Sequence, residues 1–266
     1  MKINIYQIDA FTDKLFSGNP AAVCPLENWL ADEILQNIAI ENNLAETAFF
    51  VPLSKNRYHL RWFTPEIEMD LCGHATLASA FVIFNELGNN NNEILFDTQS
   101  GLLTVKKIRD YLELDFPSRP PKKADLPKII RDGLNIQPKE IWKARDYLLI
   151  YDSQEDIKRI QPNIAILNQI NINPGGIIVS ALGDSKNVDF VSRLFTPQAT
   201  VFEDPVTGSA HCTLIPFWAE RLNKTKLRAL QISQRGGELI CQLNNDRVAI
   251  RGKAVKYLEG TIQLLK

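Results

Sequence analysis

Two long segments of the chain are apolar on almost every side, and each begins at a glycine. One segment runs from Gly73 to Phe84, shortly before Gly88, and the other runs from Gly208 to Leu222. A helix that is apolar all round belongs in the middle of a core rather than on a surface. The pattern therefore predicts two buried helices, one in each half of the chain.

Shorter segments in which apolar and polar residues alternate surround these helices and predict β-strands. In the first half, strands are expected at residues 3–11, 21–24, 47–52, 58–64, 93–97, 102–108 and 111–116, with an amphipathic helix at 32–43. In the second half, strands are expected at 141–151, 176–181, 189–195, 229–234, 238–243, 247–252 and 257–265, with helices near 128–134 and 154–163. Each half is thus predicted to consist mostly of strands around one buried helix.

The two halves also repeat one another in sequence. Three matches follow in the same order at a nearly constant offset: Arg61–Pro65 with Arg193–Pro197, Gly73–Ala75 with Gly208–Ala210, and Thr98–Gly101 with Ser233–Gly236. Such ordered matches predict two structurally similar domains. We place them at residues 1–117 and 118–266, because the proline-rich stretch 117–123 favours an extended connection. The pattern leaves open whether the last strand packs back on the first domain.

Composition and charge narrow the classes of partner. The chain has 266 residues, of which 45% are hydrophobic, and this is enough for two modest cores. With 30 basic and 31 acidic residues and no long run of like charge, it lacks the electrostatic footprint of a nucleic-acid-binding protein. The longest weakly charged stretch, residues 160–187, is too rich in Asn, Gln and Pro to span a bilayer. We therefore expect a protein that binds neither nucleic acid nor membranes.

The N-terminus and the cysteines indicate the compartment. Residues 1–9 alternate like a strand and lack the continuous apolar core of a signal peptide. The four cysteines are scattered without a disulfide framework or a paired CxxC spacing, which suits a reducing environment. We therefore expect a cytoplasmic protein.

Both predicted central helices begin with a glycine and a polar residue, Gly73 with His74 and Gly208 with Ser209. The first N–H groups of a helix have no partner within it, so two such ends facing one cleft would bind a carboxylate or a developing oxyanion. The structural alternative is that each glycine only permits a tight entry into the helix. The repetition favours function, and it predicts a small anionic metabolite as the partner.

Two carboxylates and two Cys/His pairs are further candidates. Asp204 precedes Gly208 by four residues, where it could also cap the helix, and Glu46 lies among apolar neighbours in what could also be a surface loop. Cys72 and His74 flank a glycine, and His211 and Cys212 are neighbours on a helix, where side chains diverge by about 100°. Because this is poor chelating geometry, we expect no metal site.

Five segments, taken in order and spacing, resemble the PhzF-like family, which is named for a phenazine-biosynthesis isomerase: Phe16–Val23, Glu46–Phe49, Arg61–Pro65, Cys72–Thr76 and Asp204–Ala210. They cover nearly the whole chain. Wider relatives are diaminopimelate epimerase and proline racemase. The resemblance implies an α+β fold of two pseudo-symmetric half-barrel domains, each a mostly antiparallel sheet wrapped around a central helix, in agreement with the repeat.

The resemblance also implies a function. It implies a cofactor-independent isomerase that moves a proton on a small carboxylate-bearing substrate similar to trans-2,3-dihydro-3-hydroxyanthranilate. The family's proton-shuttling glutamate falls on Glu46, assisted by His74, Asp204 and Ser209 in a cleft between the domains. Four further residues are expected to contact the substrate: Asn19, Cys72, Gly73 and Gly208. Relatives are often homodimers, so a homodimer is expected.

Two alternatives remain. One is an amino-acid racemase or epimerase that uses Cys72; the related epimerases use one thiol from each half. Here Pro205–Thr207 occupies the place of the second thiol, and Cys212 lies about one helical turn deeper, which disfavours two-thiol chemistry. The other alternative is a catalytically silent metabolite-binding or interaction protein, against which the intact set of polar residues argues.

Overall fold

The computed structural model describes residues 1–172 and 175–264, and the chain forms two compact units. The first unit comprises Met1–Asp115 together with the chain from Arg251 onward, and the second comprises Phe116–Ile250. Because the last strand pairs with the first one along most of its length, the C-terminal segment belongs to the first unit.

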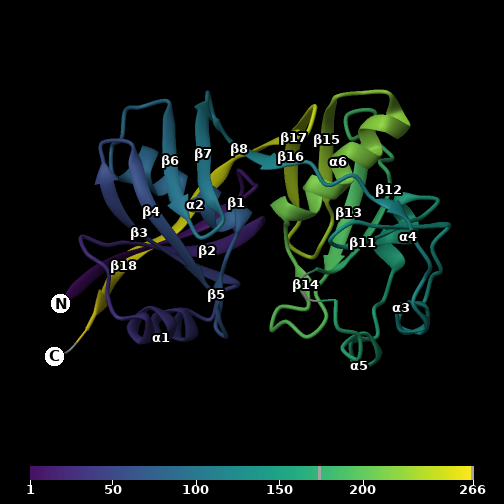
Figure 1. The fold of residues 1–266 in the computed structure, drawn as a ribbon, viewed down its shortest axis with the longest axis horizontal. Coiled ribbons are helices and arrows are strands. Elements are labelled where there is room, and N and C mark those ends of the chain that lie inside the picture. The colour runs from purple at the N-terminus through teal and green to yellow at the C-terminus, as the bar shows by residue number, and fades with distance from the viewer. Residues whose placement is uncertain (173–174, 265–266) are drawn as a thin grey trace. The chain divides into compact units, whose positions relative to one another are not determined.

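The first unit is a mostly antiparallel sheet with two helices (Figure 1). Its strands are β1 (Lys2–Ala10), β2 (Asn19–Pro25), β3 (Glu46–Ser54), β4 (Arg57–Phe63), β5 (Glu68–Met69), β6 (Glu93–Thr98), β7 (Gly101–Ile108), β8 (Tyr111–Pro117) and β18 (Ala254–Gln263). Its helices are α1 (Asp32–Asn42) and α2 (Gly73–Phe81), and α2 continues into a π-helical turn, η1 (Val82–Glu86). The pairs β2–β3 and β4–β6 are parallel, and the other pairs described for this unit are antiparallel.

The second unit repeats this plan. Its strands are β9 (Lys122–Lys123), β10 (Glu140–Lys143), β11 (Tyr147–Ile150), β12 (Ile177–Leu182), β13 (Phe190–Phe195), β14 (Glu203–Asp204), β15 (Lys226–Gln231), β16 (Gly237–Asn244) and β17 (Arg247–Gly252). Its helices are α3 (Lys128–Asp132), α4 (Gln154–Arg159), α5 (Ile164–Leu167) and α6 (Gly208–Leu222). The succession parallel, antiparallel, parallel, antiparallel through β2, β3, β4, β6 and β7 recurs through β11, β12, β13, β15 and β16. The predicted internal repeat is therefore a repeat of topology.

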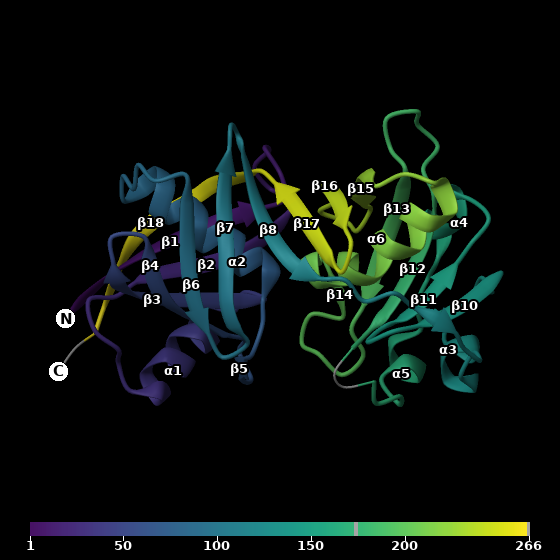
Figure 2. The same cartoon turned by 45° about the horizontal axis from the view of Figure 1, so that its top comes forward.

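The two predicted buried helices are confirmed. Every residue of α2 from Gly73 to Ala80 is buried, and α6 is buried on nearly all sides. Figures 1 and 2 show the strands of each unit beside its buried helix, α2 in the first unit and α6 in the second. The aromatic residues Trp62, Phe63 and Phe195 are also buried and belong to these cores.

The repeated Arg-x-Phe-Thr-Pro segment has a structural role in both units. The guanidinium of Arg61 on β4 binds both carboxylate oxygens of Glu68 on β5, each at 2.7 Å. Arg193 on β13 binds Glu203 on β14 in the same way, at 2.7 and 2.9 Å. Each short strand leads directly into the start of the central helix. These bidentate ion pairs therefore fix the position of the segment that precedes each central helix.

The differences from the predicted elements are local. The segment predicted as strand over residues 141–151 is a hairpin, because the chain turns at Ala144, whose N–H donates to the carbonyl of Asp146. The helix predicted at 154–163 ends at Arg159, and α5 follows as a separate short helix capped by Asn163. Of the strand expected at 257–265, residue 265 lies outside the described residues.

No helix among the described residues has the length and apolar character needed to cross a membrane.

Candidate functional site

The most closely connected group of predicted site residues lies at the start of α2. The Nε2 atom of His74 lies 3.0 Å from Oε2 of Glu46, with both side chains largely buried. On the other side of the ring, Nδ1 of His74 lies 3.1 Å from Nδ2 of Asn19 and 3.6 Å from Sγ of Cys72. Three residues, Asn19, Glu46 and Cys72, thus surround the imidazole ring of His74, and two of them are far from it in the sequence.

The strand order explains why these residues meet. Asn19 opens β2 and Glu46 opens β3, and the two strands run parallel, with Ala21 opposite Glu46. Helix α2 packs on both strands, which brings His74 in its first turn against their beginnings. Glu46 is therefore the first residue of a strand rather than part of a surface loop.

Gly18 shapes the turn that presents Asn19. Its φ is +69°, a conformation that residues with a side chain rarely adopt, and a Cβ at this position would lie 2.2 Å from the carbonyl oxygen of Ala10. Only glycine therefore lets the chain turn here and place Asn19, which is fully buried, beside His74.

The electrostatics single out His74. Burial disfavours its charged form, but Cys72 and Glu46 favour it more strongly, so the pKa of His74 lies well above its ordinary value. Burial is also the main cause that raises the pKa of the Cys72 thiol. A buried histidine that has a strongly shifted pKa and lies next to a carboxylate is typical of functional sites.

One sequence-based expectation about this group concerns metal binding, and the expectation of no metal site stays a prediction. Cys72 and His74 were expected to be poorly placed for chelation because they flank a glycine, yet their Sγ and Nδ1 atoms are only 3.6 Å apart. The reason is that Cys72 is the extended N-cap residue of α2, so its side chain turns toward the first turn of the helix instead of diverging from it. Glu46 joins them, and one ligand atom from each of the three residues lies within 4.8 Å of the others.

The second unit holds the remaining predicted residues at the start of α6. Asp204 ends β14, and its carboxylate accepts a hydrogen bond from the hydroxyl of Thr207, the N-cap residue of the helix. Gly208 is buried, and Ser209 in the first turn is partly exposed. The expectation that Glu46 and His74 act together with Asp204 and Ser209 in one cleft stays a prediction.

Gln231 at the end of β15 organises this second group, and the sequence analysis missed it. Its side-chain oxygen accepts from the N–H of Thr207 at 2.9 Å, and its Nε2 donates to the Asp204 carbonyl at 2.7 Å and to the Thr207 hydroxyl at 3.2 Å. Gln231 is only 1% exposed. A glutamine at a buried position of a predicted strand was the one available signal, because a buried amide needs partners.

The remaining histidine on α6 is a structural residue. His211 is completely buried, and its Nδ1 donates to the carbonyl of Thr207 at 2.8 Å. Burial lowers its pKa to about 4, so the ring is neutral at ordinary pH.

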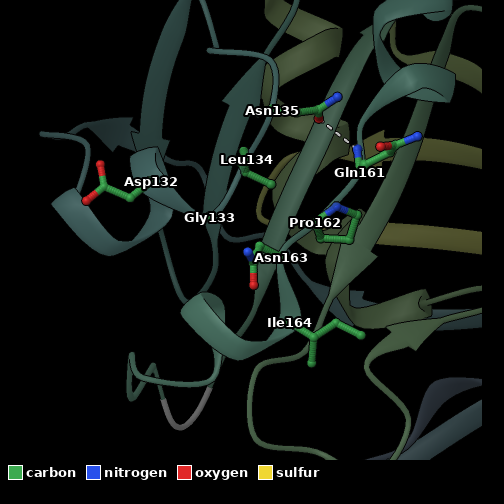
Figure 3. A pocket seen from close by; sticks show the side chains of 8 residues that line it. All are labelled: Asp132, Gly133, Leu134, Asn135, Gln161, Pro162, Asn163 and Ile164. Atoms are coloured by element: carbon green, nitrogen blue, oxygen red, sulfur yellow. Dashed lines mark hydrogen bonds between the residues drawn. The ribbon is translucent and has the colours of Figure 1, made fainter.

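A surface pocket also lies in the second unit, but none of the predicted site residues lines it (Figure 3). Its walls come from the end of α3 and the segment before α5: Asp132, Gly133, Leu134, Asn135, Gln161, Pro162, Asn163 and Ile164. Asn135 accepts a hydrogen bond from the backbone of Gln161 at 2.7 Å, which ties these two walls together.

Comparison with known proteins agrees with this arrangement. The family model described as phenazine biosynthesis-like protein matches residues 8–260. An uncharacterized isomerase of Pseudomonas aeruginosa is 47% identical over 264 residues, which cover 99% of this chain and 100% of that protein. A crystal structure of a PhzF-family protein from Enterococcus faecalis has a TM-score of 0.94 at 46% identity, with 99% of this chain and 100% of that chain covered.

A more distant structure supports the fold. A hydroxyproline epimerase from Agrobacterium vitis has a TM-score of 0.59 at 10% identity, covering 98% of this chain and 92% of that chain. The predicted α+β fold of two similar half-barrels is thus confirmed. From the matched family model and the similarity along its whole length, the chain belongs to the phenazine biosynthesis-like (PhzF) family of isomerases.

Proposed function

We propose that this protein is a cofactor-independent isomerase that moves a proton between two positions of a small carboxylate-bearing substrate, with Glu46 as the acid/base. The observation that carries the proposal is the contact of 3.0 Å between Glu46 and His74 at the start of a buried helix. A carboxylate held by a histidine on a rigid helix is suited to repeated proton transfer, because neither group has to be repositioned between the two steps.

The proposed reaction has two steps, and the proton removed in the first step is returned in the second. The Glu46 carboxylate takes a proton from a carbon of the substrate, and the electron pair left behind spreads toward an oxygen of the conjugated substrate. The resulting Glu46 carboxylic acid then returns the same proton to another carbon on the same face. His74, whose pKa is raised, stabilises the negative charge that develops between the two steps.

The ends of the central helices are suited to the substrate's carboxylate. The first N–H groups of α2 follow Cys72 and Gly73, and a helix N-terminus favours negative charge. In our proposal, Asn19, Cys72 and Gly73 bind the substrate near Glu46, Gly208 binds it at the start of α6, and Asp204 and Ser209 assist the proton transfer. The substrate is expected to resemble trans-2,3-dihydro-3-hydroxyanthranilate.

The test is proton NMR in D2O of this ring compound and of a panel of small amino and hydroxy acids. The wild-type protein should convert the ring compound, and Glu46→Gln should abolish conversion while remaining folded. Glu41→Gln is the matched control, because Glu41 is an exposed glutamate at the end of α1 in the same unit and should leave conversion unchanged.

Other outcomes would point elsewhere. Deuterium that enters only the α-position of an amino acid would indicate a racemase or epimerase, in which Cys72 takes part. Exchange that survives in Glu46→Gln would contradict the role of Glu46. Binding without exchange of any compound would favour a metabolite-binding protein. The expected homodimer can be checked on the same samples by light scattering.

A further inference from the structure

We propose that Arg119 and Arg145 in the second unit form a binding site for the carboxylate of a small organic acid. Nη1 of Arg119 and Nε of Arg145 are buried, and neither has a hydrogen-bond partner among the described residues. A buried donor without a partner costs free energy, so native proteins rarely keep one without a reason. Guanidinium groups donate in a planar fork that matches the two oxygens of a carboxylate. The unpartnered donors of the two arginines therefore point to a carboxylate as their ligand.

The placement of Arg119 follows from a proline in the central helix. Pro216 lies inside α6 and has no N–H, so the carbonyl of Cys212 one turn earlier receives no hydrogen bond from it. The N–H of Arg119 donates to this carbonyl at 2.8 Å instead. This hydrogen bond fixes the backbone of the segment that follows β8 against the second turn of α6.

The placement of Arg145 follows from the tight turn between β10 and β11. The backbone of Arg145 packs directly against Gly175, where a Cβ would lie 2.6 Å from the carbonyl oxygen of Arg145. The next residue, Asp146, is buried, and its carboxylate accepts a hydrogen bond from the N–H of Gly176 at 2.8 Å. These contacts hold the turn, so the position of the Arg145 backbone is set by the scaffold.

The charges in this group sum to a positive excess. Burial raises the pKa of Asp146, and the charges of Arg145 and Arg119 oppose that rise. Burial also raises the pKa of the Cys212 thiol to about 12, and the same two arginines oppose it. Both guanidinium groups thus lie near Asp146, yet no ion pair among the described residues joins it to either of them. Because Asp146 carries at most one negative charge, at least one positive charge is left for a ligand.

A ligand can reach the two arginines from solvent. Both side chains are only partly buried, and their remaining guanidinium nitrogens also make no hydrogen bond within the described part of the chain. These nitrogens are therefore available to an anion that arrives from water. Since the stem of an arginine side chain is flexible, a small rotation can then bring the buried nitrogen to the same anion.

The internal repeat makes this group the counterpart of the one around Glu46. Gly176 corresponds to Glu46, because each directly precedes the strand residue that pairs with the phenylalanine of the Arg-x-Phe-Thr-Pro segment. At this place the second unit thus has no acid/base side chain, and it has Arg145 and Asp146 on the neighbouring strand. We assign the bound carboxylate to the substrate on which Glu46 acts. This assignment rests on the proposed function, whereas the binding of a carboxylate does not.

The experiment is a titration of the full-length protein with 2-aminobenzoate, a stable ring acid, followed by calorimetry and by NMR of the arginine Nε–H groups. We expect 2-aminobenzoate to bind and to shift the Nε–H signals of Arg119 and Arg145. Arg119→Gln and Arg145→Gln should each weaken this binding at least about 10-fold, because each removes charged hydrogen bonds to the ligand. The neutral analogue 2-aminobenzamide should not shift these signals, and inorganic phosphate should compete only weakly.

The matched control is Arg131→Gln, because Arg131 is an exposed arginine on α3 of the same unit. It should retain the full affinity for 2-aminobenzoate. Equal binding of the acid and the amide, or unchanged affinity in both arginine variants, would overturn the proposal. Phosphate that binds as tightly as the acid would contradict the preference for a carboxylate. If a variant does not fold, unmoved Arg119 and Arg145 signals in the wild-type protein would overturn the proposal equally.

Kinetics separates this inference from the proposed function. Binding of 2-aminobenzoate that depends on the arginines, without exchange of any substrate proton, would leave the site standing and contradict the isomerase. If the ring compound is converted, Arg145→Gln should raise KM at least about 10-fold, for the same loss of charged hydrogen bonds. Conversion that depends on Glu46 but keeps its KM in Arg119→Gln and Arg145→Gln would contradict the assignment to the substrate and leave the isomerase standing.

Discussion

Thr207 occupies in the second unit the place that Cys72 occupies in the first. Each is the extended residue that precedes a central helix, with φ and ψ of −140° and 115° at Cys72 and −114° and 102° at Thr207. Each also offers its carbonyl to a side chain one turn later, Cys72 to the hydroxyl of Thr76 and Thr207 to the ring of His211. At this equivalent position, the first unit therefore has a thiol and the second unit has a hydroxyl.

This pairing bears on the racemase alternative. Removing and returning a proton on opposite faces of a carbon needs an acid/base group on each face, and the related epimerases use two thiols. A threonine hydroxyl does not titrate in the ordinary pH range, and that of Thr207 is already donated to Asp204. The pairing therefore agrees with our proposal of transfer by one carboxylate on one face, which the NMR experiment can check.

The pKa of His74 provides a first prediction. Its ring should stay protonated at pH values well above the ordinary pKa of histidine, and Glu46→Gln should lower its pKa by removing a neighbouring negative charge. NMR titration of ring-labelled histidine measures both, because the chain has only three histidines. His211 is the internal reference, since it should remain neutral until the pH falls to about 4.

The same shift predicts how stability depends on pH. A histidine whose pKa is raised on folding stabilises the protein fully below its unfolded pKa of about 6.5, and this stabilisation is lost as the pH rises through the folded pKa. The difference in unfolding free energy between wild type and His74→Gln should therefore shrink as the pH is raised above 6.5. Urea unfolding at several pH values measures it, and a difference that grows with pH would contradict the assignment.

A second prediction concerns the Arg–Glu pairs that hold the short strands. Arg61→Met and Arg193→Met should each destabilise the protein by about 1.5–3 kcal/mol, because each leaves a partly buried carboxylate without its charged partner. Arg57→Met is the control: Arg57 binds Asp97 with the same fork geometry, but on the surface. It should cost less than about 1 kcal/mol. Equal losses in all three variants would show that the buried pairs have no special role.

Gln231 gives a third prediction. Gln231→Leu leaves the N–H of Thr207 without its acceptor in a buried place, which should cost about 1–3 kcal/mol of stability. It should also speed amide hydrogen exchange at the start of α6, because the segment from Asp204 to Thr207 loses its anchor. Gln169→Leu, at an exposed glutamine, is the control and should change neither quantity. Unaltered amide hydrogen exchange in Gln231→Leu would show that Gln231 does not anchor the start of α6.

The turn at Gly18 gives a fourth. Gly18 and Gly88 have the same φ of +69°, but a Cβ at Gly88 would contact nothing within 4 Å, whereas one at Gly18 would meet the Ala10 carbonyl at 2.2 Å. Gly88→Ala should cost about 1–2 kcal/mol, the usual penalty for a left-handed residue. Gly18→Ala should cost clearly more and should shift the NMR signals of His74, because Asn19 moves. Equal costs would mean that the loop relaxes around the added methyl group.

Much of this fold can be predicted from the sequence, because the two central helices are apolar all round and start at glycines. The short motifs that recur in the same order in both halves also predict two similar domains. The motifs did not reveal what each residue does. Arg61 and Arg193 belong to the clearest repeat, and each forms an ion pair that holds a short strand. Their partners Glu68 and Glu203 follow after loops of different length, so the sequence did not reveal these pairs.

The site was predicted less completely than the fold. Glu46 and Asn19 were identified through the family resemblance, and their contacts with His74 depend on the parallel pairing of β2 with β3, which alternation of residues cannot reveal. Gln231 was missed because nothing in its own strand indicates the turn that it holds. The closeness of Cys72 to His74 was misjudged because an N-cap residue does not follow helical geometry.

The pairing of β1 with β18 has a consequence for how the molecule is made. Met1 and Leu264 exchange hydrogen bonds of 2.8 and 2.9 Å, so the first strand, which pairs with β2 on one side, meets its second neighbour β18 only after the second unit has been synthesised. The second unit, which is continuous in sequence, can fold as it emerges from the ribosome, while the first must wait with β1 exposed along one edge. Loss of the last strand would therefore damage the part of the molecule that begins the chain, including the unit that carries Glu46.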